Sequence, residues 1–182
     1  GWHYIRQFLS MTVAPGGMGK SSLAIVEALA MTTTRELLGE TLNEPLRVWL
    51  WNGEDPFEEM QRRIVAACRY FGITEADIAG RLFVDSGRDM PMVLVRETRD
   101  GVQIDESAIA SIIDTIERNQ IDVFIADPFV LTHQVNENSN MAIDQVMRQW
   151  ARIAEKTNTA IGLFHHVRKG LSGQGEFTVE DG

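Results

Sequence analysis

The sequence predicts a three-layer α/β/α fold built on a mostly parallel β-sheet. Short apolar runs alternate with longer segments of helical periodicity, the order that right-handed β–α–β crossovers produce. Two of these runs, 47–52 and 123–126, are largely apolar at consecutive positions, as expected of strands buried on both faces. Since 182 residues suffice for one sizeable α/β core and are too few for two, we expect a single domain over 1–182.

The predicted elements can be placed along the chain from apolar periodicity and turn residues. In the first half they are a strand at 8–13, a helix from 21 to about 33, a strand at 47–52, a helix ending near 72, a short strand at 82–84 at the sheet edge, and a β-hairpin insertion at 92–105. In the second half they are a helix carrying isoleucines 109, 112, 113 and 116, a strand at 123–126, a long loop at 128–140, a helix around 143–153, and a strand at 160–164.

The helix after the strand at 47–52 has the clearest start signal. Asp55 is the expected N-cap, Pro56 the first helical residue and Glu58 the third. This start directly follows Glu54, so the predicted helix fixes where that acid can lie.

Residues 14–21 form a phosphate-binding loop motif between a predicted strand and a predicted helix. Ala14-Pro15-Gly16-Gly17-Met18-Gly19-Lys20-Ser21 fits the pattern [A/G]-x-x-x-x-G-K-[S/T], with Ala14 where the strict form has glycine. The glycines let backbone N–H groups surround a β-phosphate, and the helix N-terminus favours an anion. Lys20 should reach the β- and γ-phosphates, and the Ser21 hydroxyl should bind Mg²⁺. With ATP and Mg²⁺ as cofactors, the expected binding residues are Pro15, Gly16, Gly17, Met18, Gly19, Lys20, Ser21 and Ser22.

Acidic residues end two other predicted strands. Asp127 follows four apolar residues, the pattern of a Walker B aspartate that supports Mg²⁺ through water, although a turn or helix cap has the same pattern. Glu54 is the candidate base or polariser for an attacking water, the alternative being a first-turn acid favoured by the helix dipole. Because ligands of such sheets bind at the carboxyl ends of the strands, both acids should lie near the loop.

Two histidines and two basic residues follow the last predicted strand. Because side chains alternate along a strand, only one of His165 and His166 can face the nucleotide, and we assign the γ-phosphate sensor to His165. A metal pair is disfavoured because no further Cys or His spacing supports it. Arg168 and Lys169 are either solvated charges or reach the γ-phosphate of a neighbouring subunit.

The composition of the chain constrains its function less than the motifs do. A net charge of −9 argues against a nucleic-acid binder that uses its whole surface, but it allows DNA held by a few basic loops inside a ring. The sequence has no apolar run near the length of a membrane span and no opening signal peptide, so we expect a cytoplasmic protein. The single cysteine, Cys68, excludes an internal disulfide.

Four motifs together resemble the RecA-like ATPases of the plasmid RepA hexameric-helicase type, with similar sequences in phage and prophage ATPases. The resemblance extends from Phe8 to Gly170 and depends on 14–21, Gly53-Glu54-Asp55-Pro56, Ile125-Ala126-Asp127-Pro128-Phe129, and Phe164-His165-His166-Val167-Arg168-Lys169-Gly170. It implies that Lys20, Ser21, Glu54 and Asp127 carry phosphate binding, Mg²⁺ ligation, water activation and Mg²⁺ support, with His165 as sensor and Arg168 or Lys169 acting in trans. It also implies a homo-oligomeric ring, typically a hexamer, with ATP at the interfaces and single-stranded DNA through the middle. RecA-like cores normally continue further than Gly182, so we expect a domain truncated at its C-terminal end.

These features favour an ATP-hydrolysing DNA helicase or translocase that serves the replication of a phage or mobile element. One alternative is a P-loop small-molecule kinase, which usually needs an arginine-rich lid; near the phosphates the sequence offers only Arg168 and Lys169. The other is a nucleotide-dependent regulatory or scaffold module, against which Glu54 argues because it supplies a group for hydrolysis.

Overall fold

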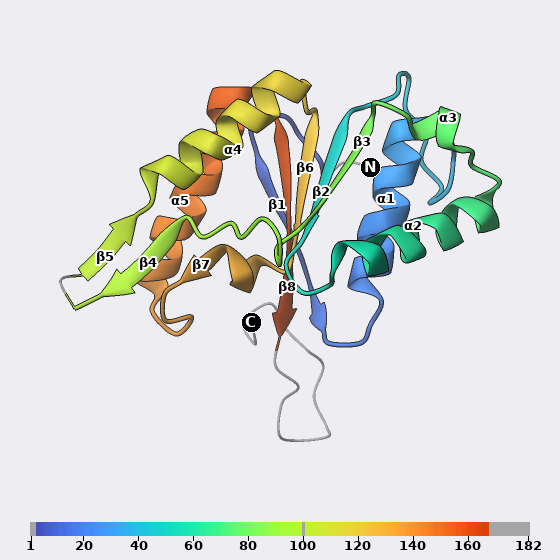
Figure 1. Cartoon of the computed structure of the whole chain (residues 1–182). Helices are drawn as coiled ribbons and strands as arrows, with labels where there is room; N and C mark the ends of the chain where they lie inside the picture. The colour runs from blue at the N-terminus through green and yellow to red at the C-terminus, as the bar shows by residue number, and fades with distance from the viewer. Residues whose placement is uncertain (1–2, 100, 168–182) are drawn as a thin grey trace.

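A five-stranded parallel sheet forms the centre of the protein in a computed structural model, which describes residues 3–99 and 101–167 (Figure 1). Its strand order is β1-β8-β6-β2-β3. The strands are β1 (Leu9–Pro15), β2 (Val48–Asn52), β3 (Leu82–Ser86), β6 (Val123–Asp127) and β8 (Ala160–Val167). The parallel sheet confirms the predicted fold class, with β3 at an edge as expected. The last strand lies between β1 and β6, which brings its end beside the phosphate-binding loop.

Helices cover both faces of this sheet (Figure 1). The helices α1 (Lys20–Thr33), α2 (Phe57–Phe71) and α3 (Glu75–Ile78) lie on one side, and α4 (Glu106–Asn119) and α5 (Asn140–Thr157) lie on the other. No helix within the described residues is long and apolar enough to cross a membrane.

The strands supply a separate hydrophobic core to each helical layer. Every residue of β2 and β6 is buried, which explains their continuous apolar runs. Trp49 and Phe124 pack into the core that includes α4 and α5, whereas Leu50 and Ile125 pack into the core beneath α1 and α2. The sheet is therefore held between two packed layers, which fixes the positions of the residues at the strand ends.

A second sheet lies beside the first and contains the predicted hairpin. The strands β4 (Val95–Thr98) and β5 (Gly101–Ile104) pair antiparallel, which confirms the hairpin. Asp100 lies outside the described residues. The strand β7 (His133–Gln134) pairs parallel with β4 and gives the order β5-β4-β7.

The prediction of a loop over the whole of 128–140 is wrong. This segment contains the 3-10 helix η1 (Phe129–Thr132) as well as β7. The Thr132 hydroxyl donates to the carbonyl oxygen of Phe129 at 2.8 Å, and the indole N–H of Trp150 donates to Thr132 Oγ at 3.2 Å. Contacts with α5 and β4, which no local pattern reveals, therefore order the segment.

The predicted start of α2 is wrong by one residue. Pro56 is the N-cap, its carbonyl oxygen accepts from the N–H of Glu59 at 3.0 Å, and the helix begins at Phe57. Asp55 instead forms an ion pair with Arg63, with Nη1 2.8 Å from Oδ2. The Asp55 carboxylate therefore faces Arg63 and does not accept from the backbone N–H groups of the first helical turn.

Candidate nucleotide-binding site

Residues 16–19 form an open turn between β1 and α1. Gly17 and Gly19 have φ angles of 79° and 84°, a region of backbone conformation that favours glycine. Within the described part of the chain, the N–H groups of residues 16–22 donate no hydrogen bond to a protein atom; the first bond of the helix runs from Leu23 N to Gly19 O at 2.9 Å. The turn therefore presents a set of free N–H donors at a helix N-terminus, the arrangement that binds phosphate.

Lys20 begins α1 and is buried, with 6% of its surface exposed. Its ammonium group donates to the carbonyl oxygens of Ala14 and Pro15, the second at 2.8 Å. Burial lowers the pKa of Lys20, and the charges of Asp127 and Glu54 act in the opposite direction. The two acids therefore lie at the same end of the sheet as Lys20, as the parallel strand order requires.

Asp127 ends β6 and has two carboxylate oxygens without a partner. The residue is 1% exposed, and neither oxygen has a hydrogen bond to any described atom. The His166 ring is the side chain beside it, with Nε2 3.7 Å from Oδ1, too far for a hydrogen bond. A buried carboxylate is costly unless a cation or water satisfies it.

This environment fits hydrated Mg²⁺. The residues at 3–99 and 101–167 contain no group of three or more His, Cys, Asp and Glu side chains that could hold a metal alone. Mg²⁺ usually keeps several waters and shares its remaining positions between one or two protein oxygens and substrate phosphates. Ser21, half-buried at the start of α1, and Asp127 are the side chains available for that role.

His165 and His166 lie at the end of β8 and differ in their surroundings. The His165 ring meets Phe129 edge-on at 5.9 Å between centroids, and its Nδ1 is buried without a partner. Burial lowers the pKa of His165, opposed by the charge of Glu137. His166 is the histidine beside Asp127. The sequence predicts His165 as the sensor, whereas the ring beside Asp127, the predicted Walker B aspartate, belongs to His166.

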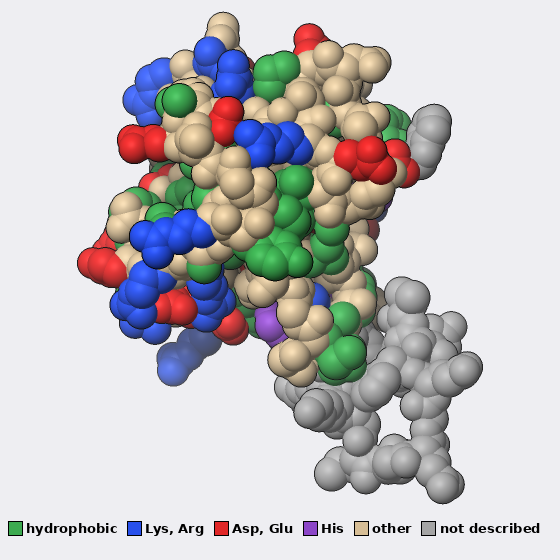
Figure 2. Space-filling view, turned by 90° about the vertical axis from the view of Figure 1, so that its right-hand side faces the viewer, with side chains coloured by type: hydrophobic (Ala, Val, Ile, Leu, Met, Phe, Trp, Pro, Cys, Tyr) green, Lys and Arg blue, Asp and Glu red, His purple; other side chains and the backbone are tan. Residues whose placement is uncertain are grey.

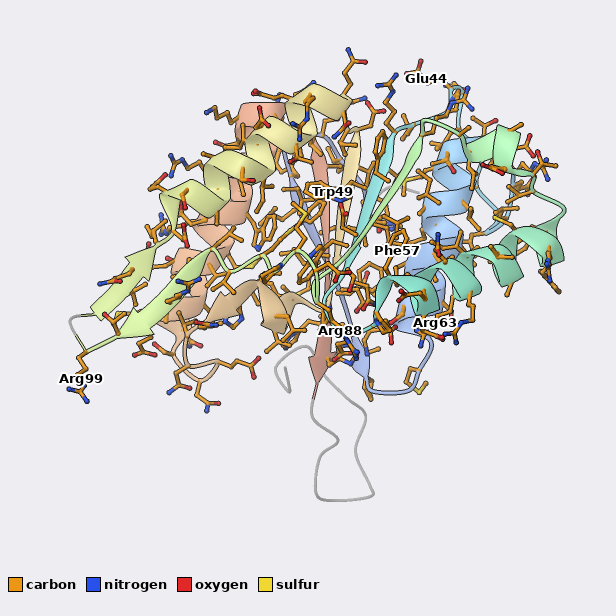
Figure 3. All side chains as sticks on the ribbon, in the orientation of Figure 1. Glu44, Trp49, Phe57, Arg63, Arg88 and Arg99 are labelled. Carbon is orange, nitrogen blue, oxygen red and sulfur yellow. The ribbon has the colours of Figure 1, made fainter. Side chains whose placement is uncertain are left out.

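Glu54 follows β2 with an exposed side chain and an ordered backbone. The side-chain oxygen of Asn52 accepts from the N–H of Glu54 at 3.0 Å, and Arg88 Nε donates to the Glu54 carbonyl oxygen at 2.8 Å. Figure 3 shows Arg88 at the carboxyl end of the sheet, on the same level as Arg63 of α2. Asn52 and Arg88 belong to none of the motifs found in the sequence. The signal for Asn52 was an asparagine before glycine at the end of a strand, a frequent turn former.

The structure brings together the loop, Lys20, Asp127, Glu54 and the two histidines of β8. It does not test two of the predicted site residues, because Arg168 and Lys169 lie outside the described residues. In chemical terms, the loop offers N–H donors to a phosphate, Asp127 offers two oxygens to a metal, and Glu54 offers a carboxylate to a water.

Comparisons with known proteins agree with this geometry. Residues 3–172 match the family model described as an AAA domain. No protein with a curated description matches the sequence. Among solved structures, the RadB recombinase is similar, with a TM-score of 0.57 and 16% sequence identity. That alignment covers 94% of this chain and 66% of the RadB chain, so this chain spans slightly less than two thirds of that protein. The chain belongs to the AAA domain family and has the fold of a RecA-like P-loop ATPase.

Proposed function

We propose that this domain hydrolyses ATP in the presence of Mg²⁺. The observation that carries the proposal is the convergence of complementary groups at one end of the sheet. This end of the sheet carries a loop with free N–H donors, a buried ammonium group, an unpartnered buried carboxylate and, at the next strand end, a glutamate. These are the kinds of groups that the chemistry uses, and they support the proposal.

In this proposal each group has a separate task. The N–H groups of residues 16–22 and the Lys20 ammonium bind the phosphates, and Lys20 leaves the carbonyl oxygens of Ala14 and Pro15 to do so. The Ser21 hydroxyl and Asp127 hold Mg²⁺, which when bound neutralises charge on the β- and γ-phosphate oxygens. Glu54 orients the attacking water and accepts its proton.

We further propose that the domain works as a ring-forming helicase or translocase on single-stranded DNA in the cytoplasm. The order of the four motifs supports this role by resemblance. On the face formed by α1, α2 and α3, positive and negative side chains are interspersed (Figure 2). A DNA contact through a few loops, with Arg168 or Lys169 reaching the next subunit's nucleotide, is compatible with the net charge of −9. One of the two histidines of β8 senses the γ-phosphate.

The test of hydrolysis is ATP turnover with and without Mg²⁺ in the wild type and Glu54→Gln. We expect the variant to bind ATP normally and to turn it over about 10²- to 10⁴-fold more slowly, because it lacks the general base. Normal turnover in Glu54→Gln would assign water activation to another group. Phosphate transfer to a small acceptor would indicate a kinase instead.

The proposed role as a ring-forming helicase or translocase is tested by adding single-stranded DNA and by measuring the size of the oligomer in solution. We expect DNA to stimulate turnover, and specific activity to rise with protein concentration because a basic residue acts across an interface. A monomer whose specific activity is independent of concentration and of DNA would fit a nucleotide-dependent regulatory module better.

A further inference from the structure

We propose that Asn52 is a positioning residue that holds Glu54 in its catalytic place, with Ser86 and Arg88 completing the same clamp. The inference rests on the proposed function, in which Glu54 activates water. It adds residues from two strand ends that neither the motifs nor the family assignment identify.

Asn52 closes the turn that carries Glu54. It is the last residue of β2 and is 2% exposed. Its side-chain oxygen accepts from the N–H of Glu54 at 3.0 Å and from that of Asp55 at 2.8 Å. A single amide oxygen therefore fixes the two peptide groups on either side of the catalytic residue, as an Asx turn does.

Ser86, the last residue of the neighbouring strand β3, and Arg88, just beyond that strand, fix the carbonyl groups of the same turn. The Ser86 hydroxyl donates to the carbonyl oxygen of Asp55 at 2.7 Å. Arg88 Nε donates to the carbonyl oxygen of Glu54 at 2.8 Å. Both N–H groups and both carbonyl groups of residues 54 and 55 are therefore held by side chains, while the carboxylate of Glu54 makes no hydrogen bond within the described residues.

The turn is also tied to the strand of the Walker B acid. Asn52 is in register with Asp127 of β6, and the N–H of Gly53 donates to the Asp127 carbonyl oxygen at 2.8 Å. The position of Glu54 relative to the proposed metal ligand is thus set by backbone contacts. A displacement of a catalytic group by about 1 Å can lower the rate on the order of 10²-fold. The backbone contacts that hold Glu54 relative to Asp127 should therefore affect the rate of hydrolysis.

Close packing prevents the turn from shifting. A Cβ atom on Gly53 would lie 2.7 Å from Leu131 Cδ1 and 2.8 Å from the Trp51 ring. A Cβ on Gly87 would lie 2.6 Å from the Cα atom of Gly53. Gly53 and Gly87 therefore allow the turns after β2 and β3 to pack directly against each other. This packing restricts movement of the turn that carries Glu54, although the Glu54 side chain itself is exposed.

The experiment compares ATP turnover in the wild type, Asn52→Ala, Asn52→Ser, Glu54→Gln and the Asn52→Ala/Glu54→Gln double variant. We expect Asn52→Ala to lower kcat about 10- to 100-fold while KM for ATP stays within about twofold, because phosphate binding uses other groups. Asn52→Ser should recover part of the loss, since a hydroxyl can accept the same N–H more weakly. In the Glu54→Gln background, Asn52→Ala should cost no more than about twofold, because the group that it positions has been removed.

A second variant and a control separate positioning from general damage. Arg88→Ala removes an exposed side chain from the same clamp and should lower kcat about fivefold at constant KM. Asn119→Ala removes an asparagine hydrogen bond to the Thr115 carbonyl oxygen at the other end of the sheet and should leave kcat unchanged. Thermal unfolding of each variant shows whether the fold is retained.

The outcomes distinguish this inference from the proposed function. If the wild type and Glu54→Gln behave as proposed but Asn52→Ala turns over at the wild-type rate, the positioning role alone is overturned. It is equally overturned if Asn52→Ala lowers kcat by the same factor in both backgrounds, which would indicate a structural role. If the wild type does not hydrolyse ATP, the proposed function fails and this inference fails with it.

Discussion

The two ends of the central sheet differ in how their polar side chains are satisfied. At the amino end, Asp122 accepts from Arg6 Nη2 at 2.6 Å and from the backbone N–H of Arg47 at 2.7 Å. Nearby, the buried Glu27 of α1 accepts from the Tyr4 hydroxyl at 2.8 Å. These groups are paired within the protein, so they stabilise the fold without a ligand.

The carboxyl end shows the opposite arrangement. Among the described residues, five buried side-chain atoms have no hydrogen-bond partner, and all five are near this end: Asp127 Oδ1 and Oδ2, His133 Nε2, His165 Nδ1 and His166 Nε2. Each such atom costs free energy of folding. The polar groups of the amino end therefore stabilise the fold by themselves, whereas those of the carboxyl end would gain their missing partners from a ligand, as the proposed function requires.

The largest effect should come from Lys20→Ala, which removes the buried cation next to the phosphate-binding loop. We expect kcat/KM for ATP to fall about 10²- to 10³-fold or more, since the ammonium group contributes to both phosphate binding and transition-state charge. Circular dichroism should show an unchanged fold. Lys156→Ala, in the exposed last turn of α5, is the matched control. Wild-type turnover in Lys20→Ala would show that the loop is not the active site. It would also contradict the proposed difference between the two ends of the sheet.

A pair of isosteric substitutions tests the comparison most directly. Asp127→Asn removes a buried charge without a partner, so the free energy of unfolding should stay constant or rise by about 1 kcal/mol, while Mg²⁺-dependent turnover falls. Asp122→Asn weakens two hydrogen bonds to a carboxylate that is 23% exposed, so the free energy of unfolding should fall by about 1–2 kcal/mol with turnover unchanged.

Urea unfolding and ATP turnover, measured on both variants, check this pair. Loss of stability in Asp127→Asn together with loss of activity in Asp122→Asn would reverse the roles of the two ends. Equal losses of stability would show that both aspartates serve mainly to hold the fold.

The sequence predicted the carboxyl end well because its signals are local or follow from strand order. Continuous apolar runs identified β2 and β6. Asp127, which ends β6, and Glu54, just after β2, lie at one end of the sheet because all five strands are parallel. The phosphate-binding loop directly follows its strand in the chain, so the position of the loop could be predicted without knowledge of tertiary contacts.

The contact between Arg88 and the Glu54 backbone joins segments that are 34 residues apart, so no local pattern predicts it. Asn52 precedes Glu54 by two residues, so its contact is local and follows from the asparagine before glycine at the end of β2. The strand β7 exists because β4 pairs with it. Alternation along a strand shows only that the side chains of His165 and His166 point to opposite faces of the sheet. Which of the two could act as the γ-phosphate sensor depends on how β8 is oriented in the sheet.

The smallest effect concerns the pH dependence of stability at the carboxyl end. His133 is 5% exposed and packs against the Phe129 ring at 4.9 Å between centroids. Burial lowers its pKa, the charge of Glu137 opposes the shift, and His165 adds to it. The folded state therefore keeps this ring neutral at pH values where the unfolded chain, with an ordinary pKa of about 6.5, has already bound a proton.

As pH falls below about 6.5, the unfolded state binds more protons than the folded state, so the free energy of unfolding must fall, by at most about 1.4 kcal/mol per pH unit for one histidine. The loss stops once pH is below the folded-state pKa. His133→Gln should therefore show a shallower decline than the wild type in urea unfolding between about pH 6.5 and 5, because other groups contribute equally to both proteins. Parallel curves for the two proteins would mean that His133 takes up its proton as easily in the fold as in the unfolded chain. One of the five unpartnered atoms would then carry no cost, and the contrast between the two ends would rest on Asp127 and the histidines of β8 alone.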